Sequence, residues 1–397
     1  MTPPDPARKL FVIPNDPLYR YAAKGEVKER YFNPENFWDE IHVLSLCDRD
    51  EALDSARRMA GRAGVEIHPL GRPGALTWPG VLSRARKLAE EIKPQVIRAY
   101  NPLFMGWLAV RLAESSGAAS VVSVHDDYSL SRSLKIYGPG YLFTTRGAYQ
   151  IVHSLLGLNR TSLGRPDQVV CAYRFPVLYV RRWRKDDLSV IYNRVDLDQF
   201  KPAEPDQARQ TGPLRILNVG RQFEGKDPEP IIRALSGLDN ATLTLVGDGP
   251  YHDRLVRLAG KLGLSERVTF LPSVAHRELP GLYREQDVFA MSITQPGVCI
   301  PVLEASASGL PVVINQPRWE DKPEVVEDLA EVVPLSAEGY RLAFERLLKD
   351  DSYRRERGLA LRDRVLRIEG RAMEKAEREL YQRLLEKAAV RERQAQA

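Results

Sequence analysis

Residues Arg215–Asp227 read RILNVGRQFEGKD, and this stretch decides the fold class of the chain. Its opening residues, Arg215–Val219, form a short apolar run that is typical of a strand buried in a parallel sheet. A glycine-bearing loop follows, and a helical pattern then covers Pro228–Ser236. Strand, loop and helix in this order make one βα step, and the same step recurs along most of the chain.

Two series of βα steps are predicted, separated by a polar, proline-bearing segment that begins at Asp198. We therefore expect an N-terminal Rossmann-like domain over 1–197, a linker over 198–212 and a C-terminal Rossmann-like domain over 213–370. A charged amphipathic helix is predicted over 371–390. The predicted strands are Lys9–Ile13, Ile41–Leu46, Val65–Ile67, Val96–Arg98, Ser120–Val124, Gln168–Ala172, Ser189–Tyr192, Arg215–Val219, Thr242–Val246, Val268–Leu271, Val288–Met291, Val312–Ile314 and Glu331–Val333.

The composition agrees with two ordinary packed domains. The chain has 397 residues, of which 43% are hydrophobic and 28% charged, and its net charge is +5. No apolar run is long enough for a transmembrane helix, and the first residues do not resemble a signal peptide. The three cysteines lie far apart in sequence, which favours neither a disulfide framework nor a metal knuckle. We expect a cytoplasmic protein.

Two cations in the loop after Val219 are candidates for phosphate binding. Ligands of open α/β sheets bind beyond the carboxyl ends of the strands. Arg221 offers a planar fork and Lys226 a point charge, a combination that can grip a diphosphate. The alternative is a solvated loop with ordinary charges. Neither this loop nor Gly247-Asp248-Gly249 completes a dinucleotide-binding glycine pattern.

A second candidate segment follows the predicted strand Val288–Met291. A loop containing Gly297 leads into a helix that carries Pro301 in its first turn and ends at Gly309. Amides at such a helix start make an anion site. Glu304 lies about one turn into the helix and can accept hydrogen bonds from a ribose diol. The alternative for Glu304 is an acid that only complements the helix dipole.

A third candidate lies in the first domain. His125 directly follows the predicted strand Ser120–Val124, which is where a side chain facing a cleft would lie. A single histidine in this position is more often structural, so its position leaves both interpretations open.

Together these segments resemble retaining glycosyltransferases of the GT-B fold, specifically family 4. Leu217–Arg221 with Lys226 resembles the phosphate-gripping loop of that family, and Leu245–Pro250 resembles its next strand and turn. Leu303-Glu304-Ala305 followed by Gly309–Val313 is the most specific match. Further matches are Val268–Leu271 through Val274, Glu278-Leu279 with Leu282-Tyr283, and Ile191–Asp196 with Phe200-Lys201-Pro202.

The resemblance implies an α/β fold of two Rossmann-like, doubly wound domains facing each other across a cleft, with the C-terminal helix crossing back to the first domain. It also implies roles for single residues. Arg221 and Lys226 would neutralise the donor diphosphate, Glu304 would bind the ribose, and His125 would approach the donor sugar. The donor-binding set would be completed by Gly220, Val274, Gly297, Val298, Cys299 and Ile300.

The sequence departs from the family pattern at three places. Pro296 stands where the family usually has a second glutamate that contacts the donor sugar, which puts sugar identity and activity in question. Arg194 replaces a usual glycine. The usual glycine pair after the first strand is replaced by a long insert, Asn15–Asp39, in which Lys24 and Gly25 are weak candidates for the acceptor side.

The expected activity is transfer of a hexose-type sugar from a UDP- or GDP-sugar to a hydroxyl acceptor, with an α linkage and without a metal or other cofactor. Phosphate-binding cations and helix amides can stabilise the departing diphosphate. Two alternatives stay open: a nucleotide-sugar epimerase on the same fold, and a degenerate transferase that acts as a scaffold or binding protein.

The expected partners are a nucleotide-sugar donor and a glycan or lipid-linked acceptor, and no nucleic acid. The run Arg181–Lys185 combines basic and aromatic side chains, which suits peripheral contact with the anionic inner surface of a membrane. The alternative is a solvated segment before the predicted strand Ser189–Tyr192.

Overall fold

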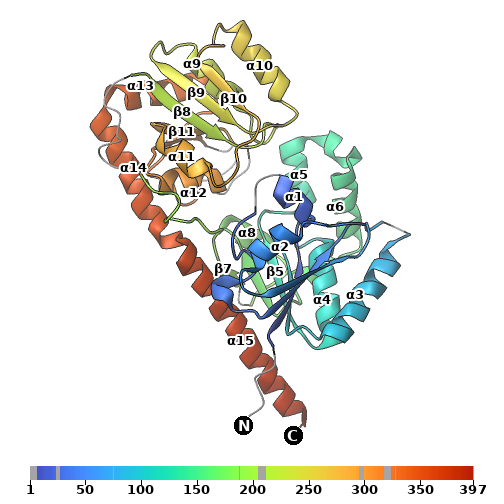
Figure 1. Cartoon of the computed structure of the whole chain (residues 1–397). Helices are drawn as coiled ribbons and strands as arrows, with labels where there is room; N and C mark the ends of the chain where they lie inside the picture. The colour runs from blue at the N-terminus through green and yellow to red at the C-terminus, as the bar shows by residue number, and fades with distance from the viewer. Residues whose placement is uncertain are drawn as a thin grey trace. The chain divides into compact units, whose positions relative to one another are not determined.

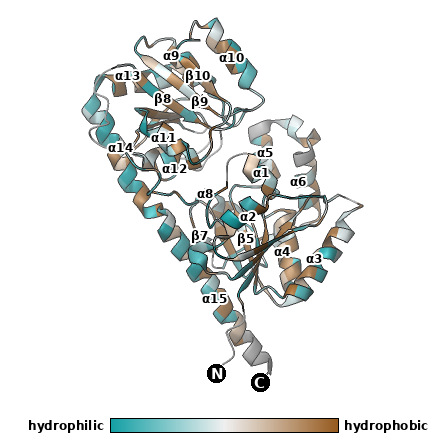
Figure 2. Cartoon of the chain, viewed as in Figure 1, coloured by the Kyte–Doolittle hydropathy of each residue, from teal (hydrophilic) through white to brown (hydrophobic). Residues whose placement is uncertain are grey.

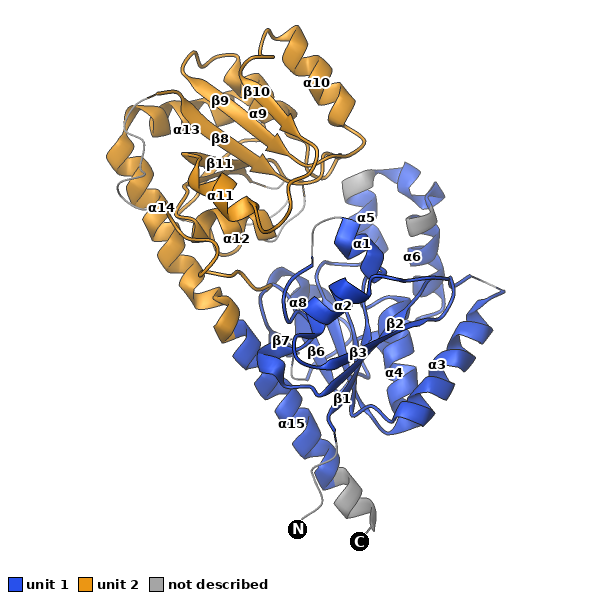
Figure 3. Cartoon of the chain, in the orientation of Figure 1, with its two compact units in different colours: residues 1–192, 373–397 blue, residues 193–372 orange. Residues whose placement is uncertain are grey.

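A computed structural model of the chain shows two compact units, residues 1–192 with 373–397 and residues 193–372 (Figures 1 and 3). Both are α/β units built on a parallel sheet, as the sequence predicts. The structure describes residues 7–23, 27–74, 76–186, 188–203, 212–294, 299–316, 323–326 and 328–396, without the side chains of 136, 137, 145, 146 and 391–396.

The sheet of the first unit has seven strands in the order β3-β2-β1-β4-β5-β6-β7, and every neighbouring pair is parallel. Two cores cover its two faces. Val12, Ile41 and Val43 belong to one core, whereas Phe11 and Leu44 belong to the other. Burial on both faces explains the nearly continuous apolar runs. The strands are β1 Lys9–Ile13, β2 Glu40–Ser45, β3 Gly64–Pro69, β4 Val96–Ala99, β5 Ala119–Val124, β6 Gln168–Cys171 and β7 Leu188–Val190.

The helices of this unit follow the pattern of buried stripes and capped ends. α4 is apolar around much of its circumference because it packs between the sheet and the helices α3 and α7, and Figure 2 shows its strongly hydrophobic colouring. Ser129 and Thr144 cap the helices that follow them. The helices are α1 Leu18–Ala23, α2 Leu53–Ala60, α3 Trp78–Ile92, α4 Phe104–Ser116, α5 Leu130–Tyr137, α6 Thr145–Leu155, α7 Asn159–Ser162 and α8 Phe175–Val180.

The second unit repeats the plan with six parallel strands in the order β10-β9-β8-β11-β12-β13. Its main core joins strand residues such as Leu243 to Ile231 and Phe344 of the covering helices. The strands are β8 Leu214–Val219, β9 Ala241–Val246, β10 Val268–Leu271, β11 Val288–Met291, β12 Val312–Asn315 and β13 Glu331–Val333. The helices are α9 Glu229–Leu235, α10 His252–Lys261, α11 Leu279–Arg284, α12 Ile300–Ala307, α13 Ala337–Lys349 and α14 Asp351–Val365.

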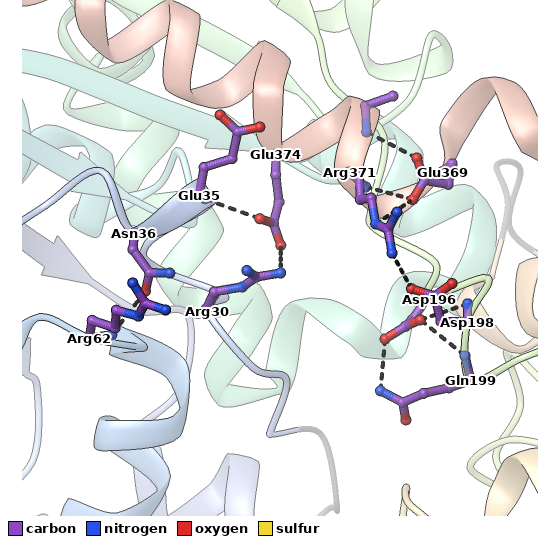
Figure 4. A network of polar contacts seen from close by, with 11 residues as sticks. Arg30, Glu35, Asn36, Arg62, Asp196, Asp198, Gln199, Glu369, Arg371 and Glu374 are labelled. Carbon is purple, nitrogen blue, oxygen red and sulfur yellow. Dashed lines mark hydrogen bonds and ion pairs between the residues drawn. The ribbon is translucent and has the colours of Figure 1, made fainter.

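The last helix, α15 Gly370–Gln396, begins in the second unit and continues into the first, as predicted. In the second unit, Arg371 donates a hydrogen bond to Asp198 (2.5 Å; Figure 4). In the first unit, Glu374 accepts from the Arg30 guanidinium and from the Glu35 amide.

The buried stripe of α15 joins the core of the first unit through Leu380, Tyr381 and Leu384. The predicted apolar stripe therefore marks the face that packs, and that packing holds the helix on the N-terminal domain. Among the described residues, no helix combines the length and the apolarity needed to cross a bilayer.

Candidate functional site

The strand order of the second unit places a topological switch point between β8 and β11, the two central strands. The chain leaves β8 toward β9 on one side, and leaves β11 toward β12 on the other. In open α/β sheets ligands bind at this point, beyond the carboxyl ends of the strands. The predicted residues Gly220, Arg221 and Lys226 follow β8, and Cys299, Ile300 and Glu304 follow β11.

The loop after β8 is a tight turn held against the loop after β9. The Gly220 amide donates to Val246, and the Gln222 amide donates to the Asp248 carbonyl (both 2.9 Å). The Lys226 amide donates to the Phe223 carbonyl (2.8 Å), and this bond closes the turn. The Lys226 side chain is half-buried, and its Cδ lies 3.6 Å from where a Gly220 Cβ would be. Arg221 is exposed and so is accessible to an anion.

The two glycines after β9 permit this close approach. A Cβ on Gly247 would lie 2.2 Å from the Gly220 carbonyl oxygen, and one on Gly249 would lie 2.2 Å from the Gln222 carbonyl oxygen. Both glycines have positive φ angles, +124° and +158°. Gly247 and Gly249 therefore allow the loop after β9 to pack directly against the candidate phosphate-binding loop after β8. The sequence Gly247-Asp248-Gly249 is not itself a dinucleotide-binding motif.

The segment after β11 is hydrogen-bonded to the β8 loop. The Thr294 amide donates to the Gly225 carbonyl (3.1 Å), and the Ser292 hydroxyl donates to the Asp227 carbonyl (2.6 Å). These bonds fix the positions of the two loops relative to each other, as a preorganised site requires.

Helix α12 starts directly after this segment. Cys299 is its extended N-cap residue and Ile300 its first residue, with Pro301 in the first turn as predicted. The positive end of the helix dipole consequently lies next to the β11 loop. Gly297 and Val298, which the sequence assigns to the donor site, lie outside the described residues, and so does Pro296.

Among the predicted site residues that the structure describes, Glu304 is the most completely enclosed, with 4% of its surface exposed. One carboxylate oxygen accepts from the Tyr283 hydroxyl (3.2 Å), and the other lies 3.2 Å from Nε2 of His276. Burial and the Glu304 charge raise the pKa of Tyr283 well above its usual value, so its hydroxyl stays protonated and donates. A carboxylate offers about four acceptor positions, so further donors can still be bound.

The surroundings of Glu304 include an aromatic residue that sequence analysis did not place in the site. Phe200 is buried and packs edge-on against both His276 and Tyr283. Val274 is half-buried in the turn between β10 and α11, two positions before His276. His276 lies five positions after the predicted strand Val268–Leu271, and this place in the loop after a strand was the signal that could have identified it.

His125 lies in the first unit and directly follows β5, at the predicted strand end. Burial and the nearby Arg98 guanidinium lower the pKa of His125 from 6.5 to about 4. The imidazole is therefore neutral at pH 7 and can donate one hydrogen bond and accept another. Lys24 and Gly25 lie outside the described residues.

Two family models together match residues 39–363. The model described as glycosyltransferase family 4 matches residues 39–199, and the model described as glycosyl transferases group 1 matches residues 200–363. The chain belongs to glycosyltransferase family 4. This is a family of transferase enzymes, and its two models divide the chain within the segment that joins the two parallel sheets.

Similarity to individual proteins supports this family 4 glycosyltransferase assignment. The chain is 36% identical over 137 residues to D-inositol 3-phosphate glycosyltransferase of Mycolicibacterium smegmatis. The aligned stretch covers 32% of this chain and 31% of that protein. The match thus spans about a third of the length of the curated relative.

Solved structures share the GT-B fold with this family 4 glycosyltransferase. Anabaena HepE in complex with UDP has a TM-score of 0.73 at 17% identity, covering 94% of this chain and 99% of HepE. Sucrose-phosphate synthase of Thermosynechococcus elongatus has a TM-score of 0.74 at 18% identity, covering 95% and 99%.

Proposed function

We propose that this protein transfers a hexose-type sugar from a nucleoside diphosphate sugar to a hydroxyl acceptor. The observation that carries the proposal is the buried Glu304 carboxylate on α12, at the switch point of the donor-side sheet. Its bonds to Tyr283 and His276 hold it in one orientation, as recognition of a ribose diol requires. HepE, which has the same fold, was crystallised with UDP and glucose, which favours UDP as the first donor base to test.

In the proposed mechanism the donor diphosphate lies over the β8 loop. Arg221 pairs with its oxygens as a fork and Lys226 as a point charge, while the start of α12 adds its amides. These groups stabilise the negative charge that grows on the leaving diphosphate. Lys226 suits this role because its half-buried stem lies close to Gly220, at the start of the β8 loop.

The transfer is proposed to retain the anomeric configuration. The bond from the anomeric carbon to the diphosphate oxygen breaks, and the acceptor oxygen bonds to the same face of the sugar. The acceptor proton passes to the departing phosphate oxygen. Starting from an α-linked donor, the product is an α-glycoside. The neutral His125 is proposed to donate a hydrogen bond to a sugar hydroxyl.

The charge stabilisation described here requires no metal, and we propose that none takes part in transfer. Arg221, Lys226 and the α12 amides supply the positive potential that a divalent ion would otherwise provide. Full transfer in the presence of EDTA is the expected result, and a requirement for added Mg²⁺ or Mn²⁺ would exclude this part of the proposal.

We propose cytoplasmic action on a glycan or lipid-linked acceptor, with peripheral contact to the membrane surface. Exposed apolar side chains of the first unit support the contact, among them Phe143 (93% exposed), Leu155 (81%) and Leu178 (77%). Of the basic run, Arg181 and Arg184 hydrogen-bond backbone carbonyls, whereas Arg182 and Lys185 are exposed. Binding to anionic but not neutral vesicles is the expected result, and equal sedimentation with both would exclude an electrostatic contact.

The direct test is a transfer assay with labelled UDP- and GDP-sugars and a panel of hydroxyl acceptors, with the product anomer read by NMR. An α-linked product supports the proposal, and a β-linked product would exclude retention. Conversion of the donor sugar without any acceptor product would favour the epimerase alternative. Nucleotide binding without any chemical turnover would favour the scaffold alternative, which the sequence raises through Pro296.

A further inference from the structure

The outer strands β2 and β3 of the first unit carry two histidines whose ring nitrogens face each other. Nδ1 of His42 lies 3.1 Å from Nε2 of His68, and the rings are nearly parallel, with centroids 5.3 Å apart. Each histidine side chain has 11% of its surface exposed. β3 is the edge strand of this sheet, and the pair lies on the same sheet face as Phe11 of β1.

A carboxylate completes a triangle with these nitrogens. An oxygen of Glu66 lies 3.7 Å from His42 Nδ1 and 3.8 Å from His68 Nε2. The strand register explains the convergence, because His42 pairs with Glu66 and Leu44 pairs with His68. Tetrahedral zinc with bonds of about 2.0–2.1 Å separates neighbouring ligand atoms by about 3.3 Å. The three observed separations bracket that value.

The environment also supplies a second group that orients a metal ligand. Nε2 of His42, the nitrogen turned away from the cluster, is buried without a hydrogen-bond partner, and Glu40 is the carboxylate next to it, at 3.6 Å. The Lys9 ammonium pairs with the same Glu40 oxygen (3.3 Å). Metal-binding histidines characteristically direct their second ring nitrogen at a carboxylate.

We propose that His42, His68 and Glu66 bind a divalent transition-metal ion of the Zn²⁺ class, independently of the glycosyl-transfer site. Two imidazoles and one carboxylate suit zinc and leave one coordination position for water. Among the described residues, this is the one group of three such side chains whose ligand atoms converge. The ion fastens the edge strand β3 to β2. The alternative is a plain hydrogen bond between the two imidazoles.

Calorimetric titration of the chelator-stripped full chain with ZnCl₂ tests the proposal. We expect one ion per chain with a micromolar or lower Kd, and a rise in the melting temperature of about 5–10 °C at a hundredfold excess over Kd. His42→Ala and His68→Ala should abolish binding, and Glu66→Gln should weaken it about tenfold. His252→Ala, which removes a histidine elsewhere in the chain, is the matched control.

A spectroscopic measurement keeps the test independent of variant stability. Co²⁺ bound at this site should give the visible ligand-field bands of a tetrahedral nitrogen and oxygen set. Thiolate charge-transfer bands would assign the ion to a cysteine instead and overturn the proposal. So would zinc binding that persists in folded His42→Ala and His68→Ala proteins, or the absence of zinc binding to the stripped wild-type chain.

Discussion

Arg98 of β4 and Glu377 of α15 form a buried ion pair, although 279 positions of sequence separate them. Both side chains have 6% of their surface exposed. The guanidinium also donates to the Tyr381 hydroxyl (2.5 Å) and to the Ser123 hydroxyl (3.2 Å), so its buried donors have acceptors besides the Glu377 carboxylate. Burial is the larger cause of the lowered pKa of His125, and the same guanidinium adds to it. The C-terminal helix therefore supplies the counterion of this buried guanidinium.

Removing one partner of this pair should be strongly destabilising. Glu377→Gln leaves the Arg98 charge buried without its counterion, and we expect the first unit to lose about 3–5 kcal/mol of unfolding free energy. Replacing both residues together, by Arg98→Met with Glu377→Leu, should restore much of that loss. Urea unfolding monitored by fluorescence measures both effects. Equal stability of Glu377→Gln and wild type would contradict the buried geometry.

The lowered pKa of His125 predicts a loss of stability in acid. Between pH 6.5 and about 4 the unfolded chain binds a proton on this imidazole that the folded chain does not. The contribution is thus fully present above pH 6.5, and it declines by about 3 kcal/mol as the pH falls to 4. The difference in unfolding free energy between wild type and His125→Gln, measured at pH 7 and pH 5, isolates this residue. A difference that does not change with pH would show that the pKa of His125 is the same in the folded and unfolded chain.

The hydrogen bond from Tyr283 to Glu304 should make a smaller contribution to nucleotide affinity than Glu304 itself. Tyr283→Phe removes one donor and should weaken binding of the nucleoside diphosphate by a factor of about 2–10. Glu304→Ala removes the acceptor itself and should weaken it about 10–100-fold. Titration calorimetry ranks the two variants. An effect of Tyr283→Phe as large as that of Glu304→Ala would mean that the tyrosine contacts the ligand directly.

Substitution of Gly247 should distort the candidate phosphate-binding loop, although Gly247 lies outside that loop. A Cβ there would lie 2.2 Å from the Gly220 carbonyl oxygen, so Gly247→Ala must displace the peptide that joins Gly220 to Arg221. We expect at least a tenfold loss of nucleotide affinity. Gly263→Ala is the control, because Gly263 also has a positive φ, +70°, but a Cβ there has open space. Equal affinities of the two variants would separate the Gly247 turn from the site.

The sequence predicted the position of every described strand, because buried parallel strands are continuous apolar runs bounded by turns. The same reasoning missed features that depend on pairing between distant segments. Glu377 looks like one more charge on an amphipathic helix, and only the packing of α15 shows that Arg98 lies opposite. His42 and His68 alternate with apolar residues as in any half-buried strand, and the predicted strand Val65–Ile67 stopped before His68.

In the candidate site, position after a strand or within a helix start is the basis for predicting Arg221, Lys226 and Glu304, and their roles stay predictions. The aromatic and imidazole partners of Glu304 were not identified as such, because they reach it from α11 and from the turn before it. Spacing along one segment carries no information about such a contact. The departure at Pro296 is visible in sequence, and its consequence is a question for the transfer assay.

The central claim is that the second unit binds a nucleoside diphosphate sugar through Arg221 and Glu304. Titration calorimetry of the purified chain with UDP, GDP and ADP tests it most directly, with Arg221→Ala, Glu304→Ala and the exposed α10 variant Arg257→Ala measured beside wild type. The account predicts that one diphosphate binds, and that its affinity falls about 10–100-fold in the first two variants and is unchanged in the third. Binding to none of the three nucleotides, or equal binding by all four proteins, would contradict it.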